Sequence, residues 1–207
     1  MIWTFGNKIL TVDDKWADMG IPPVDPYNPL NLPDKTIRLR YMDDMTPTFP
    51  KGTAVQVTSS PNVWDLTYND NNWYVLLECN AYLLEVLGAN TRGVTNMEGM
   101  FSGSTALTSV PLFNTSSVTN MAGMFDGCRS LTSVPLFNTS SVTSMTRMFY
   151  GCELVESGAL ALYQQASTQT VPPNNHRECF TYCGKDTVTG RAELGQIPMS
   201  WGGGGPD

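Results

Sequence analysis

Five cysteines and a single histidine are the residues of this chain best suited to bind a metal ion. Structural zinc sites commonly take their ligands from Cys-x-x-Cys pairs, often combined with paired histidines. Cys179 and Cys183 do not form such a pair, and His176 lies alone in a Pro-Asn-Asn-His-Arg segment. The spacing therefore predicts no metal site and no cofactor, and it predicts that His176 lies in a solvated loop.

Paired carboxylates or an activated nucleophile are what hydrolytic catalysis would need. The aspartate pairs Asp13-Asp14 and Asp43-Asp44 stand in turn contexts, as do Asp65 and Asp70. No nucleophile motif accompanies the histidine. We therefore predict a protein that is not an enzyme and has no catalytic residues.

A tandem repeat of 24 residues dominates the chain. Leu107–Ser130 reads LTSVPLFNTSSVTNMAGMFDGCRS, and Leu131–Leu154 reads LTSVPLFNTSSVTSMTRMFYGCEL. Apolar residues recur in this register from Trp73 to Trp201. A fixed period of this length is typical of solenoids, in which each repeat packs only on its neighbours. The pattern predicts about five coils, with degenerate coils at the two ends.

Each repeat contains two β candidates and one helical turn. Residues 107–113 and 131–137 fit the leucine-rich pattern, and residues 94–97 suit a second short strand or turn. The Met-x-x-Met-Phe-x-Gly-Cys segment spaces its apolar residues for one helical turn ended by glycine. A longer helix is expected near 157–166, with Ser157 as N-cap and one apolar face: Ala159, Leu162, Tyr163 and Ala166.

The first 60 residues are predicted to form a small β-rich module. Two short strands flank Gly6-Asn7, a favoured hairpin turn, and a proline-rich spacer follows at 21–34. Ile37–Tyr41 and Val55–Val57 alternate apolar and polar residues as half-buried strands do. The fold class predicted is therefore β-rich α+β. An N-terminal docking module at 1–60 precedes a leucine-rich-repeat solenoid at 61–207.

Residues that recur at the repeat period are predicted either to fill the core or to face outward. The core rows are Met97, Met100, Met121, Met124, Met145 and Met148, and Phe101, Phe125, Phe149 and Phe180. Cys128 and Cys152 are also one period apart. Neighbouring strands lie about 4.8 Å apart, so a disulfide between them is geometrically open, but reduced core thiols are the favoured interpretation.

Phe113 and Phe137 are the first candidate ligand-facing residues. If Val110 and Leu112 point inward along a strand, these two rings point outward and form an apolar strip for a sugar ring or a protein side chain. The alternative, which we favour, is that the chain bends after Leu112 and buries both rings.

A second candidate row consists of hydroxyl and amide side chains: Thr95, Asn96, Thr119, Asn120, Thr143 and Ser144. Such a row suits the hydroxyl groups of a carbohydrate, and it equally suits a solvated face. Asn90, Asn114 and Asn138 are predicted instead to satisfy backbone groups at a turn in each repeat.

Charge and hydropathy limit the classes of partner. The chain has 19 acidic and 12 basic residues and a net charge of −7, which opposes binding to nucleic acid. No apolar stretch is long enough for membrane insertion, and the first residues lack the basic and apolar regions of a secretory signal. Only 15% of the residues are charged, a composition that suits extracellular or virion surfaces.

The repeat phrase Leu-Thr-Ser-Val-Pro-Leu-Phe-Asn-Thr-Ser-Ser-Val-Thr-Asn-Met-x-x-Met-Phe-x-Gly-Cys resembles the BspA-like leucine-rich "surface protein" repeats of bacterial adhesins and lipoproteins. This resemblance covers about residues 73–155. The segments Val155–Gln165 and Ile197–Gly203 look like the version carried by gut bacteriophages and prophages.

The resemblance implies a non-enzymatic structural protein of a bacteriophage particle, such as a fibre, spike or decoration. Its partners would be other virion proteins, bound through the N-terminal module, and a host-surface glycan or protein, bound through the repeats. Self-association is compatible with this role. The alternative expectation is an adhesin module at the bacterial cell surface.

Overall fold

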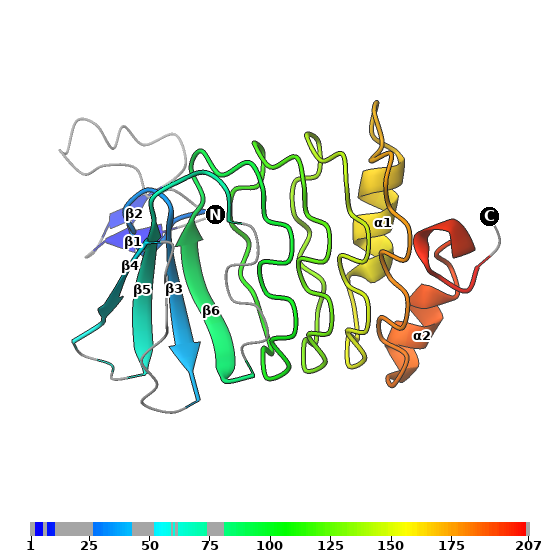
Figure 1. Ribbon diagram of the computed structural model, residues 1–207, viewed down its shortest axis with the longest axis horizontal. Helices are drawn as coiled ribbons and strands as arrows, with labels where there is room; N and C mark the ends of the chain where they lie inside the picture. Colours follow the sequence, from blue (N-terminus) through cyan, green and yellow to red (C-terminus); the bar gives the residue numbers. More distant parts are fainter. Residues whose placement is uncertain are drawn as a thin grey trace.

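The molecule has a β-sheet at one end, stacked turns in the middle and helices at the other end (Figure 1). The computed structural model describes residues 3–5, 8–10, 27–42, 52–58, 60, 62–73 and 81–205. Its elements are β1 (Trp3–Phe5), β2 (Lys8–Leu10), β3 (Thr36–Tyr41), β4 (Gly52–Gln56), β5 (Val63–Tyr68), β6 (Leu83–Asn90), α1 (Ala159–Ser167), α2 (Val188–Leu194) and the 3-10 helix η2 (Met199–Trp201).

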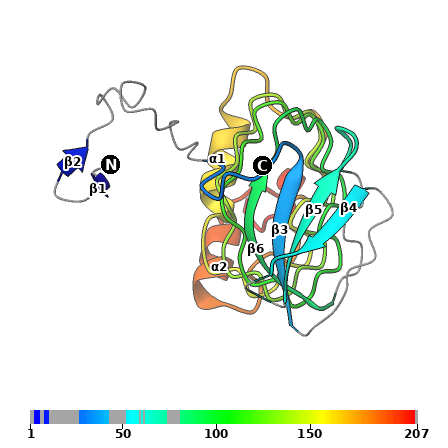
Figure 2. The same cartoon turned by 90° about the vertical axis from the view of Figure 1, so that its left-hand side faces the viewer.

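Strands β3 to β6 form one antiparallel sheet in the order β4-β5-β3-β6. The alternation in β3 buries Ile37, Leu39 and Tyr41, as the sequence predicts. The intervening Arg38 and Arg40 form ion pairs across the sheet, each at 2.6 Å. Figure 2 shows this sheet from the end of the molecule, covering the stacked turns behind it. The strand predicted near 37–41 is thus confirmed as β3. The strand predicted near 55–57 only overlaps the end of β4, and Val55 is 61% exposed where a half-buried residue was expected.

The predicted hairpin at the start of the chain is also confirmed. β1 pairs with β2 in antiparallel register, with Trp3 opposite Leu10 and Phe5 opposite Lys8. The residues between these two strands, and most of the predicted proline-rich spacer at 21–34, lie outside the described residues.

The predicted fold class is wrong in its main architecture. We expected a β module followed by a leucine-rich solenoid of about five coils, whereas the structure has one open four-stranded antiparallel sheet and two α-helices. Residues 83–90, assigned to the first coils, are strand β6, which pairs with β3. The sheet also crosses the predicted boundary at residue 60, because β3 and β4 precede it and β5 and β6 follow it. The spacing of apolar residues could not reveal this, since it does not specify which segment pairs with which.

The segments after β6 stack on one another at the repeat period, and we call each 24-residue turn of this stack a rung. Single-residue parallel bridges join equivalent positions in series: Asn72, Asn96, Asn120, Ser144 and Asn175. Backbone hydrogen bonds also run between rungs, for example from Thr119 N to Thr95 O at 2.8 Å and from Met121 N to Ser144 O at 2.9 Å. Each rung therefore satisfies part of its backbone on the rungs beside it.

The local elements predicted inside the repeats are not formed. Within residues 91–157 the structure has isolated bridges and turns, without the strands expected at 94–97, 107–113 and 131–137. The Met-x-x-Met-Phe-x-Gly-Cys segments are turns and not helical. Their glycines matter, because Gly127 and Gly151 have φ values of 74° and 67°, a left-handed conformation that other residues rarely adopt.

The core rows predicted from the repeat are confirmed. All six methionines and the four phenylalanines of these rows are fully buried. Phe101 and Phe125 stack with their ring centroids 5.3 Å apart, Phe125 and Phe149 at 5.0 Å, and Phe149 and Phe180 at 6.0 Å. The sheet, the stacked turns and the C-terminal helices share one continuous hydrophobic core.

The N-cap of helix α1 lies one residue after the predicted one. Gly158, with φ of 97°, is the N-cap in place of Ser157. A Cβ at Gly158 would lie 2.3 Å from Val134 O, so the rung packs against the helix start too closely for a side chain. Of the predicted apolar face, Ala159, Leu162 and Ala166 are buried and Tyr163 is partly buried. None of the helices in the described part of the chain has the length and apolar character needed to cross a membrane.

One buried serine interrupts a row of cysteines. Ser104 occupies the position in its rung that Cys128 and Cys152 occupy in the next two. It is fully buried, and its Oγ has no hydrogen-bond partner in the part of the chain that the structure describes. By contrast, Cys128 Sγ donates to Phe101 O at 3.1 Å. An unpaired buried hydroxyl costs about 1–3 kcal/mol.

Replacing Ser104 with cysteine should therefore raise the free energy of unfolding by about 1 kcal/mol. The thiol removes the unpaired hydroxyl and extends the row of buried cysteines. Chemical denaturation under reducing conditions measures the change. Ser117→Cys, at an exposed serine of the same stack, is the matched control and should leave stability unaltered. A less stable Ser104→Cys variant would show that the hydroxyl is satisfied after all.

Candidate functional site

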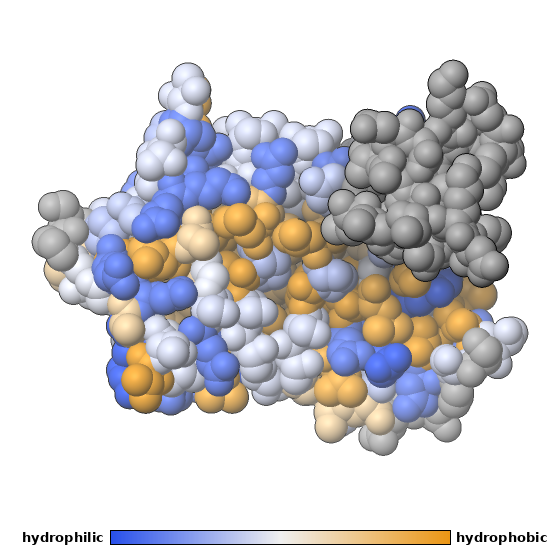
Figure 3. Space-filling view, turned by 180° about the vertical axis from the view of Figure 1, so that it is seen from behind, coloured by the Kyte–Doolittle hydropathy of each residue, from blue (hydrophilic) through white to orange (hydrophobic). Residues whose placement is uncertain are grey.

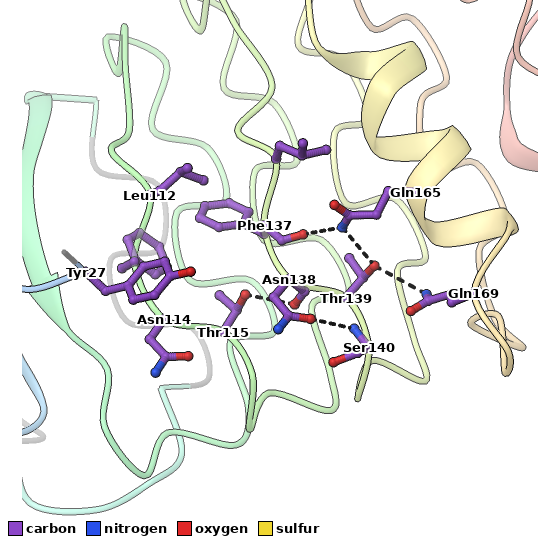
Figure 4. A pocket seen from close by; sticks show the side chains of 12 residues that line it. Tyr27, Leu112, Asn114, Thr115, Phe137, Asn138, Thr139, Ser140, Gln165 and Gln169 are labelled. Carbon is purple, nitrogen blue, oxygen red and sulfur yellow. Dashed lines mark hydrogen bonds between the residues drawn. The ribbon is translucent and has the colours of Figure 1, made fainter. Parts of the chain in front are cut away.

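Two successive rungs and the region of helix α1 enclose a pocket of about 320 Å³, which we call the groove. Each rung contributes the same stretch of its repeat, and Figure 4 shows these side chains converging between Tyr27 and the two glutamines. The described residues that line the groove are Tyr27, Leu112, Phe113, Asn114, Thr115, Leu136, Phe137, Asn138, Thr139, Ser140, Gln165 and Gln169.

The asparagines of the groove are held by their own turns. Asn114 Oδ1 accepts a hydrogen bond from Ser116 N at 3.0 Å, and Asn138 Oδ1 accepts one from Ser140 N at 2.9 Å. This is the backbone-satisfying role predicted for the asparagine row, and it is confirmed. It uses only the oxygen of each amide. The two NH2 groups donate no hydrogen bond to the described residues, and both side chains are exposed.

Buried threonines connect one rung to the next beneath these asparagines. Thr91 Oγ1 donates to Asn114 O, and Thr115 Oγ1 donates to Asn138 O at 2.8 Å. Both threonines are almost fully buried. The backbone of each asparagine is thereby fixed by the rung before it, so the exposed amides form a regular and preorganised row.

Two glutamines close the groove at the helical end. Gln165 Nε2 donates to Phe137 O at 2.6 Å and to Thr139 Oγ1 at 3.3 Å, and Gln169 Nε2 donates to the same hydroxyl at 3.3 Å. Their amide orientation is thus set by donation into the rung. The Oε1 atoms of both side chains accept no hydrogen bond from the described residues, so the groove offers acceptors at this end and donors along the asparagine row.

The groove is uncharged and partly apolar. None of the described lining residues is ionisable at neutral pH, and Leu112 and Leu136 are 49% and 48% exposed. Hydrophobic residues also gather in a band across the face of the molecule in Figure 3. An uncharged groove with amide donors, amide acceptors and aliphatic surface can hold a neutral ligand that has many hydroxyl groups. The described lining includes no carboxylate and no histidine.

The outward orientation considered for Phe113 and Phe137 is not observed. The rings are 1% and 0% exposed and pack against each other with centroids 4.8 Å apart. The reason is that residues 107–113 do not form a strand, so the expected alternation fails. Leu112 turns outward and Phe113 turns inward, which is the bend that we favoured. The two rings form the floor of the groove and not a free apolar strip.

The row of hydroxyl and amide side chains lies elsewhere on the stack. Thr95, Thr119 and Thr143 are exposed, as predicted. Thr119 Oγ1 donates to Thr95 O at 3.1 Å, and Thr143 Oγ1 donates to Thr119 O at 3.0 Å. Asn96 and Asn120 each accept a backbone N–H two residues ahead, and Asn120 Nδ2 also donates to Glu98. Ser144 bridges Asn120 and Asn175. Many polar groups of this row therefore form hydrogen bonds within the stack.

The residues that could have carried metal or redox chemistry serve the core. Cys128, Cys152, Cys179 and Cys183 are buried and unbridged, and burial raises the pKa of each thiol well above its usual value. His176 does not lie in a solvated loop as predicted. It is partly buried and stacks on Trp201 at 4.0 Å. The described residues include no cluster of three or more potential metal ligands.

Several groove residues were not among the predicted site residues. Leu112 was considered to point inward because a strand was assumed, and Leu136 was given no role. Tyr27 lies in the proline-rich stretch, where nothing in the sequence linked it to the repeats. Gln165 lies in α1 and Gln169 follows its end at Ser167, so no helical spacing linked the two glutamines in the sequence. Asn114 and Asn138 were predicted as structural residues, and the structure adds that their NH2 groups are exposed.

Most of the chain matches a known protein family. Residues 43–180 match the family described as "Mycoplasma protein of unknown function, DUF285". No curated protein and no solved structure matches. This match covers more than half of the chain and is consistent with the resemblance of the repeats to BspA-like surface proteins. The chain therefore belongs to the DUF285 family.

Proposed function

We propose that this chain is a non-enzymatic attachment protein that binds a surface glycan in the groove. The observation that carries the proposal is the repeated, uncharged lining of the groove, in which Asn114 and Asn138 present exposed NH2 groups one rung apart. Shallow glycan sites depend on several short polar contacts together with aliphatic or aromatic surface. The groove combines these with Tyr27 at one end and two half-exposed leucines.

The spacing of the rungs supports an extended ligand. The ring centroids of Phe113 and Phe137 lie 4.8 Å apart. This distance is close to the advance per residue of an extended hexopyranose chain. Consecutive sugars could therefore meet equivalent leucine and asparagine side chains on consecutive rungs.

Conversion of asparagine to aspartate separates the two roles of the amide. In Asn114→Asp the Oδ1 acceptor for Ser116 N remains, whereas the NH2 donor becomes a carboxylate oxygen. We expect Asn114→Asp and Asn138→Asp each to weaken glycan binding about tenfold, because a donor is replaced by an acceptor at the ligand. A glycan array followed by calorimetry on the bound glycans measures this effect.

Asn96→Asp is the matched control for these variants. Asn96 also accepts a backbone N–H two residues ahead, from Glu98 at 2.9 Å, but it lies in the other row. The control makes the same chemical change outside the groove and should leave glycan affinity unchanged. Equal losses in all three variants would contradict a groove site, and so would binding to proteins without binding to any glycan.

The context that we propose is the surface of a bacteriophage particle, where the chain would be a fibre, spike or decoration. The residues before Tyr27 would then contact other virion proteins. This part of the proposal rests on the phage-like segments Val155–Gln165 and Ile197–Gly203. The second candidate is an adhesin module at the bacterial cell surface, favoured by the BspA-like repeats. Mass spectrometry of purified particles and of the washed cell surface distinguishes the two, since the polypeptide should be found in the particles and not on uninfected cells.

A further inference from the structure

The groove continues past Tyr27 into a second pocket. This pocket has a volume of about 230 Å³, and it shares Tyr27 and Asn114 with the groove. The rest of its described lining comes from the next rung towards the sheet and from the chain beside Tyr27: Asn28, Ala89, Asn90, Thr91 and Arg92. A single extended ligand in contact with Tyr27 could therefore occupy both pockets.

Arg92 makes the second pocket chemically different from the groove. It stands at the repeat position that Ser116 and Ser140 occupy in the following rungs. All three residues donate their backbone N–H to an asparagine Oδ1 two residues earlier, at 3.2, 3.0 and 2.9 Å. The same turn thus places a guanidinium where the other rungs place a hydroxyl. Among the described residues Arg92 has no ion-pair partner, and its side chain is exposed.

The amide beside Arg92 is already used by the protein. Asn90 Nδ2 donates to Leu32 O at 2.8 Å and to Asp34 Oδ1 at 3.2 Å. The asparagine row therefore offers free donors on the two rungs of the groove and none on this third rung. On the third rung, Arg92 is therefore the residue that can bind a polar group of the ligand. Its guanidinium can donate two parallel hydrogen bonds to a carboxylate.

We propose that the groove and the second pocket together bind one extended, carboxylated oligosaccharide, with its neutral sugars on the asparagine row and its carboxylate on Arg92. This inference rests on the proposed glycan-binding function and specifies its ligand class. The net charge of −7 repels anions at long range, so the discrimination comes from the short contact with the guanidinium.

The test uses pairs of oligosaccharides of equal length that differ in one group. One member contains a uronic acid with its carboxylate, and the other contains the parent hexose with a hydroxymethyl group at that position. A further pair ends in a sialic acid or in the same sugar with its carboxylate reduced to an alcohol, which distinguishes a terminal carboxylate from an internal one. The wild-type chain should prefer the carboxylated member of one pair about tenfold. Arg92→Gln should abolish that preference while it keeps affinity for the neutral member.

Arg129→Gln is the matched control. Arg129 is exposed and lines neither pocket, so this variant loses the same charge and should keep the preference. Equal affinity of the wild type for both members of every pair would overturn the inference and leave the glycan-binding function standing. Failure to bind any glycan, charged or neutral, would overturn the proposed function itself.

Discussion

Replacing Phe125 with alanine should lower the free energy of unfolding by about 3–5 kcal/mol, the cost expected for removing a fully buried phenylalanine side chain. Phe125 is 0% exposed and lies in the middle of the aromatic row. Its ring stacks on Phe101 and Phe149 at 5.3 and 5.0 Å, and it lies 6.2 Å from Phe137. Its removal leaves a cavity and breaks stacking on both neighbouring rungs.

Chemical denaturation followed by tryptophan fluorescence and by far-ultraviolet circular dichroism measures this loss. Phe125→Leu is the control, because it keeps most of the volume and should cost less than about 1.5 kcal/mol. If the alanine and leucine variants were equally stable, the stacked row would contribute little.

The repeat period predicted which residues are buried inside the stack, but it did not predict the fold of the whole chain. Met121 and Phe125 could be assigned to the core because residues that recur in register must face the same environment on every rung. The role of Asn114 could be predicted because asparagine satisfies backbone groups locally. Both inferences need only a residue and its repeat neighbours, and both hold.

The sheet could not be predicted in this way. β3 lies between β5 and β6, which are separated from it along the chain, and only long-range pairing decides that order. Strand β6 carries repeat-like leucine and valine spacing, yet it pairs antiparallel with β3. Period alone does not distinguish a stacked turn from an edge strand, because both bury one side of the segment.

The groove was only partly foreseen for a related reason. Phe113 and Phe137, which form its floor, were among the predicted site residues. The direction in which Leu112 points depends on the backbone between Pro111 and Asn114, which forms neither helix nor strand. Tyr27 reaches the groove from a segment more than 80 residues away in the sequence. Gln165 in α1 and Gln169 just after it both donate to Thr139 in the rung beside them, a contact between different elements. Such sites follow from tertiary structure and not from local pattern.

Insertion of one additional repeat should lengthen the groove by one ligand-binding unit. The insert is a second copy of residues 107–130, placed between Ser130 and Leu131. The repeat that follows it begins with the same thirteen residues. The inserted copy carries Asp126→Ser and Arg129→Thr, the residues found at the equivalent positions 102 and 105. Like charges then do not stack on adjacent rungs. The new rung adds another leucine, buried phenylalanine and exposed asparagine.

We expect the enlarged protein to fold with a stability within about 1 kcal/mol of the original. The buried residues of the new rung face the same residue types as before, whereas the ion pair of Arg147 with Asp126, at 3.2 Å, is lost because the inserted copy has serine there. The groove should grow by about 4.8 Å, the spacing between adjacent rungs. The glycan length at which affinity stops rising should therefore increase by one sugar, with a gain of about tenfold for the longest glycans, the effect of one further donor and its packing surface. Calorimetry with a series of oligosaccharides of increasing length measures this shift.

The decisive control is the same insertion with Asn114→Asp in the inserted copy. This variant has the longer groove and the same number of rungs, but its new rung offers no exposed NH2 group. It should bind the original oligosaccharide length less tightly than the plain insertion and should gain nothing from a longer one. If the preferred length stays fixed in both insertion variants while both remain folded, sugars do not run along the rungs. The ligand would then cross the stack, and the repeat would set the position of the site but not the length of what it binds.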